Sequence, residues 1–144
     1  STSSDLGFGI IGSGMIADYH ALAINDATGA RFAGIAGRNA ETVAALAEKH
    51  GAPFHTTDIE ALVARDDIQV ICIATPSGAH LEPALAAIKA GKHLVIEKPL
   101  EITVERVDEL LAAAKEAGVI VAPIFQARFG HSAQLIKAAL DAGR

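Results

Sequence analysis

Aromatic residues, cysteine and long apolar runs are scarce in this sequence, and tryptophan is absent. Aromatic side chains make up only 4% of the 144 residues, although 51% are hydrophobic. The core therefore has to consist of aliphatic side chains, which is typical of a sheet that helices cover on both faces. Cys72 is the only cysteine, so an internal disulfide is excluded, and its apolar setting predicts a buried, unreactive thiol. On this ground we expect a cytoplasmic protein.

Charge of one sign is not concentrated in any part of the chain. The net charge is −5, and acidic and basic residues are interspersed. Such a surface has no field that would attract nucleic acid or an anionic membrane, so we expect neither as a partner. No apolar stretch approaches the roughly 20 residues that cross a bilayer, and no basic N-terminal segment precedes an apolar one. We expect a soluble protein without a targeting segment, and no residue spacing predicts a metal site.

The sequence does contain a regular alternation of strand-like apolar runs with helical patterns. Extended segments are predicted at residues 6–11, 30–36, 53–55, 68–74, 93–96 and 119–122. Helices are predicted at residues 15–25, 40–50, 57–64, 79–90, 104–117 and 133–143. This alternation predicts an α/β fold, a doubly wound and mostly parallel sheet with helices on both faces. Residues 1–144 are expected to form one domain, with a loose N-terminus at residues 1–5.

Cap signals predict where several of these helices begin and end. The polar residues predicted as N-caps are Asn39, Thr57 (with capping-box spacing to Glu60), Thr103 and Ser132. The glycines predicted to end helices are Gly51, Gly91 and Gly118.

A glycine-rich turn joins the first predicted strand to the first predicted helix, and it reads Gly12-Ser13-Gly14-Met15-Ile16-Ala17. In a G-x-G-x-x-A turn, Gly12 permits the tight bend and Gly14 removes a side chain that would block a diphosphate. Ala17 is small enough for the helix to lie close to the sheet, and the amides at the helix start favour phosphate. The flanking strand and helix raise this pattern above a structural turn, and it predicts a dinucleotide site in a Rossmann fold.

The end of the second strand predicts which dinucleotide is bound. Proteins specific for NAD usually place an acid there for the ribose hydroxyls, but this sequence reads Gly37-Arg38-Asn39. Arg38 can pair with a 2'-phosphate through its planar set of donors, and Asn39 can add a hydrogen bond. The pattern favours NADP over NAD. The alternative is that Arg38 is a solvated loop residue and Asn39 only a helix cap.

Two further segments follow predicted strands, at the sheet edge where open α/β sheets bind ligands. In the first, residues 74–80, Thr75 and Pro76 are predicted to line the nicotinamide side of the cofactor. The alternatives are that Ser77 only caps the next helix and that His80 has a structural role at its start, and for His80 alone the structural role is favoured.

The second segment is Glu97-Lys98-Pro99. A lysine at this edge can reach both nicotinamide and a substrate oxygen, where it would polarise a carbonyl or stabilise an alkoxide. Glu97 can orient it, and Pro99 restricts the backbone after it, where a cis Lys98–Pro99 bond is allowed. Considered alone, a lysine at a strand end is more often a surface charge.

Together these features resemble the Gfo/Idh/MocA family of oxidoreductases, which includes glucose-fructose oxidoreductase and inositol dehydrogenase. The resemblance covers essentially the whole chain and depends above all on Glu97-Lys98-Pro99. It implies that Lys98 is the active-site lysine and that residues 126–129 match a Q-x-R-F-like stretch leading to the substrate region, through Gln126, Arg128 and Phe129. The residues expected to contact cofactor are Gly12, Ser13, Gly14, Met15, Ile16, Arg38, Asn39, Thr75, Pro76, His80, Glu97 and Lys98.

The resemblance also implies a reaction, namely hydride transfer between nicotinamide and a hydroxyl or carbonyl carbon of a sugar, polyol or related compound. Members of the family are much longer, and their second domain supplies most of the substrate pocket and the oligomer interface. We therefore expect this chain to bind NADP, or else NAD, without completing turnover. His131 is expected at the start of the last helix rather than as a replacement acid–base group, and exposed apolar surface would favour a homo-oligomer.

Two other functions remain open at this point. One is a catalytically silent module that binds a dinucleotide or senses redox state. The other is a Rossmann domain for a different adenine ligand, such as S-adenosylmethionine. Glu97-Lys98-Pro99 argues against the latter, because methyl transfer does not need that lysine.

Overall fold

The computed structural model describes residues 5–144, and the loose N-terminus expected at residues 1–5 falls almost entirely outside this range. Within it, six parallel strands form one sheet in the order β3-β2-β1-β4-β5-β6. The strands are β1 (Leu6–Ile11), β2 (Ala30–Ala36), β3 (His55–Thr56), β4 (Val70–Ile73), β5 (His93–Ile96) and β6 (Val121–Pro123). The helices are α1 (Met15–Asp26), α2 (Ala40–His50), α3 (Ile59–Val63), α4 (Leu81–Lys89), α5 (Val104–Ala117), η1 (Gln126–Phe129) and α6 (His131–Asp141). The predicted doubly wound α/β fold is confirmed.

The strand order reverses direction between β1 and β4, and this reversal places the candidate site. Ile11 pairs with Ala36 on one side and with Ile73 on the other, and Ile73 pairs in turn with Ile96. Four strands therefore end in register. Their outgoing loops leave side by side at the carboxyl edge of the sheet, where ligands of such folds bind.

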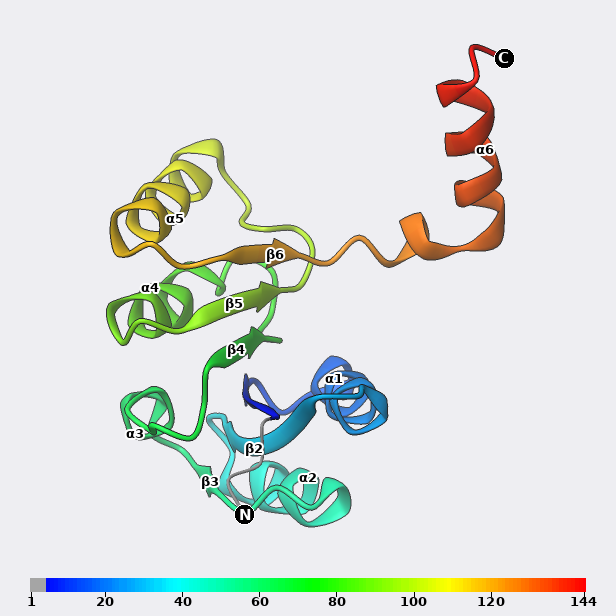
Figure 1. Cartoon of the computed structure of the whole chain (residues 1–144). Helices are drawn as coiled ribbons and strands as arrows, with labels where there is room; N and C mark the ends of the chain where they lie inside the picture. The colour runs from blue at the N-terminus through cyan, green and yellow to red at the C-terminus, as the bar shows by residue number, and fades with distance from the viewer. Residues whose placement is uncertain (1–4) are drawn as a thin grey trace.

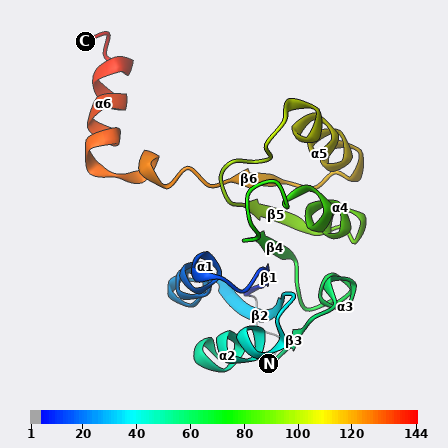
Figure 2. The same cartoon turned by 180° about the vertical axis from the view of Figure 1, so that it is seen from behind.

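Helices cover the two faces of the sheet unequally (Figures 1 and 2). Helices α3, α4 and α5 cover one face, where Ile71, Ile73 and Leu110 are fully buried. Helices α1 and α2 cover the other face only beside β1, β2 and β3, and there Ile10 and Ile35 are fully buried. This arrangement leaves the surface of β4, β5 and β6 on the α1 side without a covering helix (Figure 1).

The chain after β6 leaves the body of the domain. An extended stretch leads to η1 and α6, and both views show α6 standing away from the sheet (Figures 1 and 2). Leu135, Ile136 and Leu140 of α6 are 57%, 62% and 65% exposed. The helix has apolar side chains on its surface, and none of its residues is buried within residues 5–144.

Two predicted caps are wrong, and in each case a neighbouring residue occupies the cap position. Asp58 rather than Thr57 is the N-cap of α3, because its side chain accepts a hydrogen bond from the Glu60 amide. Gly130 rather than Ser132 precedes α6, which begins at His131. The other predicted N-caps, Asn39 and Thr103, accept hydrogen bonds at the starts of α2 and α5 as expected.

Several predicted limits shift by one to three residues. Helix α4 begins at Leu81, directly after His80. Strand β4 is shorter than the predicted segment at both ends, and β6 begins and ends later in the chain than predicted. Among the described residues, no helix has the length and apolar character needed to cross a membrane.

Candidate functional site

Gly12 and Gly14 shape the turn between β1 and α1 for different reasons. Gly12 has φ +120°, and a Cβ there would lie 2.5 Å from the Ala74 carbonyl oxygen. Only glycine therefore allows β1 and β4 to approach so closely at this edge. A Cβ on Gly14 would meet no atom within 4 Å. The space above Gly14 is open to a ligand.

The start of α1 faces this open space. Gly14 is the N-cap and uses no side chain to satisfy the first amides of the helix. The first amides of a helix have no partner within the helix, and they favour an anion. Met15 and Ile16 are exposed at this end. The turn thus has both room and donors for a diphosphate, so its residues fit the cofactor that the sequence predicts.

The loop after β2 lies beside this turn. A Cβ on Gly37 would come within 2.9 Å of Val43 and 3.0 Å of the Ser13 hydroxyl. That hydroxyl lies 2.9 Å from the hydroxyl of Thr42 on α2. Asn39 accepts a hydrogen bond from the Thr42 amide, as a helix cap does, and Arg38 is exposed beside it.

The loop after β4 is stabilised by hydrogen bonds that Thr75 and His80 make inside the protein. The Thr75 hydroxyl donates to the Ala79 carbonyl at 2.8 Å, while Pro76 and Ser77 are exposed. His80 is 1% exposed, and both of its ring nitrogens lie 2.9 Å from backbone carbonyl oxygens. The ring is enclosed by protein atoms. Of the two roles left open for His80, this placement supports the structural one.

The turn after β5 presents Lys98 at the carboxyl edge. The Lys98–Pro99 peptide bond is cis. Lys98 is exposed, and its ammonium group has no hydrogen bond or ion pair within residues 5–144. The Lys98 amide donates to Glu97 Oε2 at 3.3 Å. The lysine is thus free to meet a ligand, and its backbone is tied to the preceding carboxylate.

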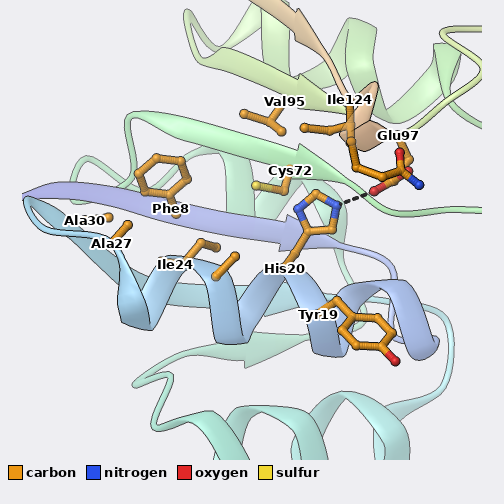
Figure 3. A pocket seen from close by; sticks show the side chains of 12 residues that line it. Phe8, Tyr19, His20, Ile24, Ala27, Ala30, Cys72, Val95, Glu97 and Ile124 are labelled. Atoms are coloured by element: carbon orange, nitrogen blue, oxygen red, sulfur yellow. Dashed lines mark hydrogen bonds and ion pairs between the residues drawn. The ribbon is translucent and has the colours of Figure 1, made fainter. Parts of the chain in front are cut away.

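His20 is a residue of this region that the sequence reasoning missed. It lies in the second turn of α1, and its Nε2 atom is 2.9 Å from Glu97 Oε1 (Figure 3). The two side chains are only 11% and 16% exposed. One histidine within a helix gives no local signal, and its partner is 77 residues away in sequence.

A buried carboxylate supports the turn from the other side. Glu101 accepts hydrogen bonds from the Leu81 and Ile102 amides and from Arg106. Burial opposes its ionisation, but these three donors outweigh burial and lower the pKa of Glu101. Glu101 thereby ties the start of α4 to α5 directly behind the lysine turn.

A hollow of about 420 Å³ opens between α1 and the uncovered part of the sheet, next to Glu97 (Figure 3). Its walls are mostly apolar, with Phe8 on β1, Val95 on β5 and Ile124 after β6 (Figure 3). Cys72 lies at its floor and is 2% exposed. Burial, with a smaller contribution from the Glu97 charge, raises the pKa of the Cys72 thiol to about 12. The thiol is therefore protonated at neutral pH.

The residues expected to lead toward a substrate lie outside this edge. Gln126 borders the hollow, whereas Arg128 stacks over the Phe129 ring at 5.4 Å in the exposed η1 turn. His131 is the first residue of α6 and is exposed. The structure brings together the glycine turn, Arg38, Thr75 and Lys98 at one edge, but not Arg128, Phe129 or His131.

Comparison with known proteins agrees with this arrangement. The sequence model of the Gfo/Idh/MocA group, described as an oxidoreductase family with an NAD-binding Rossmann fold, matches residues 6–125. The chain is 34% identical to 1,5-anhydro-D-fructose reductase of Ensifer adhaerens, over 95% of this chain and 41% of that protein. It is 30% identical to scyllo-inositol 2-dehydrogenase (NADP(+)) of Bacillus subtilis, over 85% of this chain and 37% of that protein.

A solved structure gives the same match in space. The WlbA dehydrogenase from Chromobacterium violaceum, in complex with NADH and UDP-GlcNAcA, superposes with a TM-score of 0.93 at 27% identity. The match covers 100% of this chain and 42% of that one. The chain thus spans about two fifths of the length of these relatives.

Proposed function

This chain belongs to the Gfo/Idh/MocA family of oxidoreductases, and on that premise we propose that it holds a nicotinamide dinucleotide across the carboxyl edge of its sheet with Lys98 beside the reacting carbon. The observation that carries the proposal is the open space above Gly14, next to the unpartnered amides of α1. A side chain there would occupy the position of the diphosphate. Gly14, Met15 and Ile16 are assigned to that group through their backbone.

The preference for NADP is supported at the loop after β2. The position that usually carries an acid for the ribose is Gly37, where a Cβ would crowd Val43 and Ser13. No carboxylate stands there to repel a phosphate. Arg38 follows in an exposed position, and Asn39 and Ser13 both contact Thr42 at the start of the next helix. We assign Arg38 to the 2'-phosphate as a charge-assisted donor.

Lys98 is assigned the role of holding the substrate oxygen. The bound cofactor would supply or accept the hydride. The Lys98 ammonium group, which is free of protein partners within residues 5–144, would donate to the oxygen on which negative charge develops. Thr75 and Pro76 are assigned to the nicotinamide side. Because relatives act on anhydrofructose and scyllo-inositol, we propose a polyhydroxylated substrate, with a secondary alcohol or ketone as the reacting group.

Titration with NADPH and NADH tests the cofactor assignment, with nicotinamide fluorescence as the readout. Wild-type protein should bind NADPH more tightly than NADH. Arg38→Ala should weaken NADPH binding by about 1–3 kcal/mol, roughly fivefold to 150-fold, and leave NADH binding unchanged. Arg144→Ala removes an exposed arginine at the far end of the chain and should change neither affinity. Equal affinities that Arg38→Ala does not alter would remove the assignment.

A further inference from the structure

Lys98 lies between Glu97 and Pro99. His20 contacts Glu97 from one face of the sheet, and His80 contacts Pro99 from the other face. We propose that His20 and His80 are positioning residues, which fix the lysine turn and do not touch cofactor or substrate themselves. The proposal rests on the function assigned to Lys98 above. It differs from the expectation based on the family resemblance, which placed His80 in contact with cofactor, and the sequence gave His20 no role.

His80 joins the lysine turn to the loop after β4. Its Nδ1 atom lies 2.9 Å from the Pro99 carbonyl oxygen, and its Nε2 atom lies 2.9 Å from the Thr75 carbonyl oxygen. A carbonyl oxygen only accepts hydrogen bonds, so the neutral ring satisfies only one of these contacts, and it holds the lysine turn when its proton is on Nδ1, facing Pro99. The Leu81 amide at the start of α4 is served by Glu101 instead. The His80 ring is thereby free to connect the two loops.

His20 acts from the α1 face. Its Nε2 atom lies 2.9 Å from Glu97 Oε1, and the other oxygen of that carboxylate receives the Lys98 amide at 3.3 Å. Figure 3 shows the imidazole of His20 pointing from α1 toward Glu97. Without this partner, Glu97 would be free to change rotamer and release the amide. His20 therefore influences Lys98 through one intermediate residue.

His20 and His80 contact the lysine turn through different ring nitrogens. Substitutions that replace only one of these nitrogens can therefore distinguish a role in positioning from a role in packing. The amide nitrogen of glutamine lies near the place of histidine Nε2, and that of asparagine near the place of Nδ1. Gln should therefore replace His20, whose contact uses Nε2, and Asn should not. The order reverses at residue 80, where the contact with Pro99 uses Nδ1. Leu should fail at both positions, although it fills similar space.

Amide hydrogen exchange of the 144-residue chain measures the turn directly. Pro99 has no amide, so the turn is followed by NMR through the Lys98 amide, which donates to Glu97 Oε2. We expect about tenfold faster exchange in His20→Leu, His20→Asn, His80→Leu and His80→Gln, since each loses one hydrogen bond to the turn. His20→Gln and His80→Asn should exchange like the wild type. His55→Leu, at an exposed position on β3, is the matched control.

If Asn and Gln have equal effects at both positions, the two histidine rings contribute only packing. If exchange is unchanged in the Leu variants, the rings do not stabilise the lysine turn at all. Either result overturns the proposal. Exchange is compared at a temperature where the α5 amides of all variants remain protected. If the His80 variants unfold, the His20 variants decide the outcome. NADPH affinity is measured in parallel and should fall severalfold in the same four variants. A wild-type protein that binds no cofactor, yet shows the expected exchange pattern, would contradict the proposed function and support the contacts.

Discussion

Gly12 and Gly14 are two residues apart, but an added methyl group would meet different surroundings at each. At Gly12, φ is +120° and the Ala74 carbonyl lies 2.5 Å from the added atom, whereas the space at Gly14 is empty. Gly12→Ala should destabilise the fold by about 1–3 kcal/mol, because both strain and a backbone clash are introduced. Gly14→Ala should change stability by less than about 0.5 kcal/mol. Urea unfolding measures both values.

Gly14→Ala should weaken cofactor binding, although it leaves stability almost unchanged. Gly14→Ala places a methyl group where the diphosphate is assigned, so we expect its NADPH affinity to fall at least tenfold, about 1.4 kcal/mol, while its unfolding curve stays near that of the wild type. Full NADPH affinity in Gly14→Ala would mean that no diphosphate lies above this glycine, and the assignment of the turn would be lost.

Single residues differ in how far the sequence predicts them. Gly12 and Gly14 are predictable because the pattern that identifies them includes their own flanking strand and helix. Lys98 is predictable only as part of Glu97-Lys98-Pro99. His20 was not predictable, because its partner is brought to it by the crossing of α1 and the end of β5, which the local sequence does not encode.

Helices and strands are likewise predictable where the signal is local in the sequence. Helices α2 and α5 begin and end where predicted because their caps are local, with Asn39 and Thr103 at the starts and glycines at the ends. Strands β4 and β6 are shorter than, or displaced from, the apolar runs that predict them, because pairing with a neighbouring strand decides where a strand ends. The sequence also predicts α6 as a helix, but it does not predict that the helix leaves the sheet.

Glu101 joins two elements, and its titration makes that junction sensitive to acid. Its pKa is lowered in the folded protein, so its contribution to stability is complete above its ordinary range near 4.3 and is lost as pH falls through the lower folded value. Glu101→Gln should reduce the free energy of unfolding by about 2 kcal/mol at pH 7, because charged acceptance from Arg106 and two amides is lost.

The difference between wild type and Glu101→Gln should shrink below about pH 4, since protonation gives the wild type a neutral side chain as well. Urea unfolding at pH 7 and pH 3.5 measures it. Glu109→Gln alters an exposed carboxylate of α5, the helix that follows Glu101, and should have little effect at either pH. A pH-independent difference would show that Glu101 contributes by packing rather than by charge.

At the scale of the whole molecule, one half of the sheet is covered on both faces and the other half on one face only. Most of the fully buried side chains lie under helices, but Phe8, Val95 and Ile124 border the hollow on the uncovered side. Cys72 lies at the floor of this hollow on the central strand β4, with 2% of its surface exposed. The reactivity of this thiol, the only one in the chain, therefore shows whether small molecules reach the open face directly or only after the protein unfolds.

We expect Cys72 to react with iodoacetamide only through opening of the sheet. Its pKa of about 12 leaves little thiolate at pH 8, and the side chain is enclosed, so the folded protein should react far more slowly than the same chain in urea. A ligand present at about 100 times its Kd stabilises the folded state by about 2.7 kcal/mol, so NADPH at that level should slow labelling about a hundredfold if global unfolding is required. Mass spectrometry of the alkylated chain measures the rate, with Cys72→Ser as the blank. Labelling at the rate of an unhindered thiol, unaffected by NADPH, would instead mean that the hollow opens to the reagent while the dinucleotide edge of the sheet stays folded.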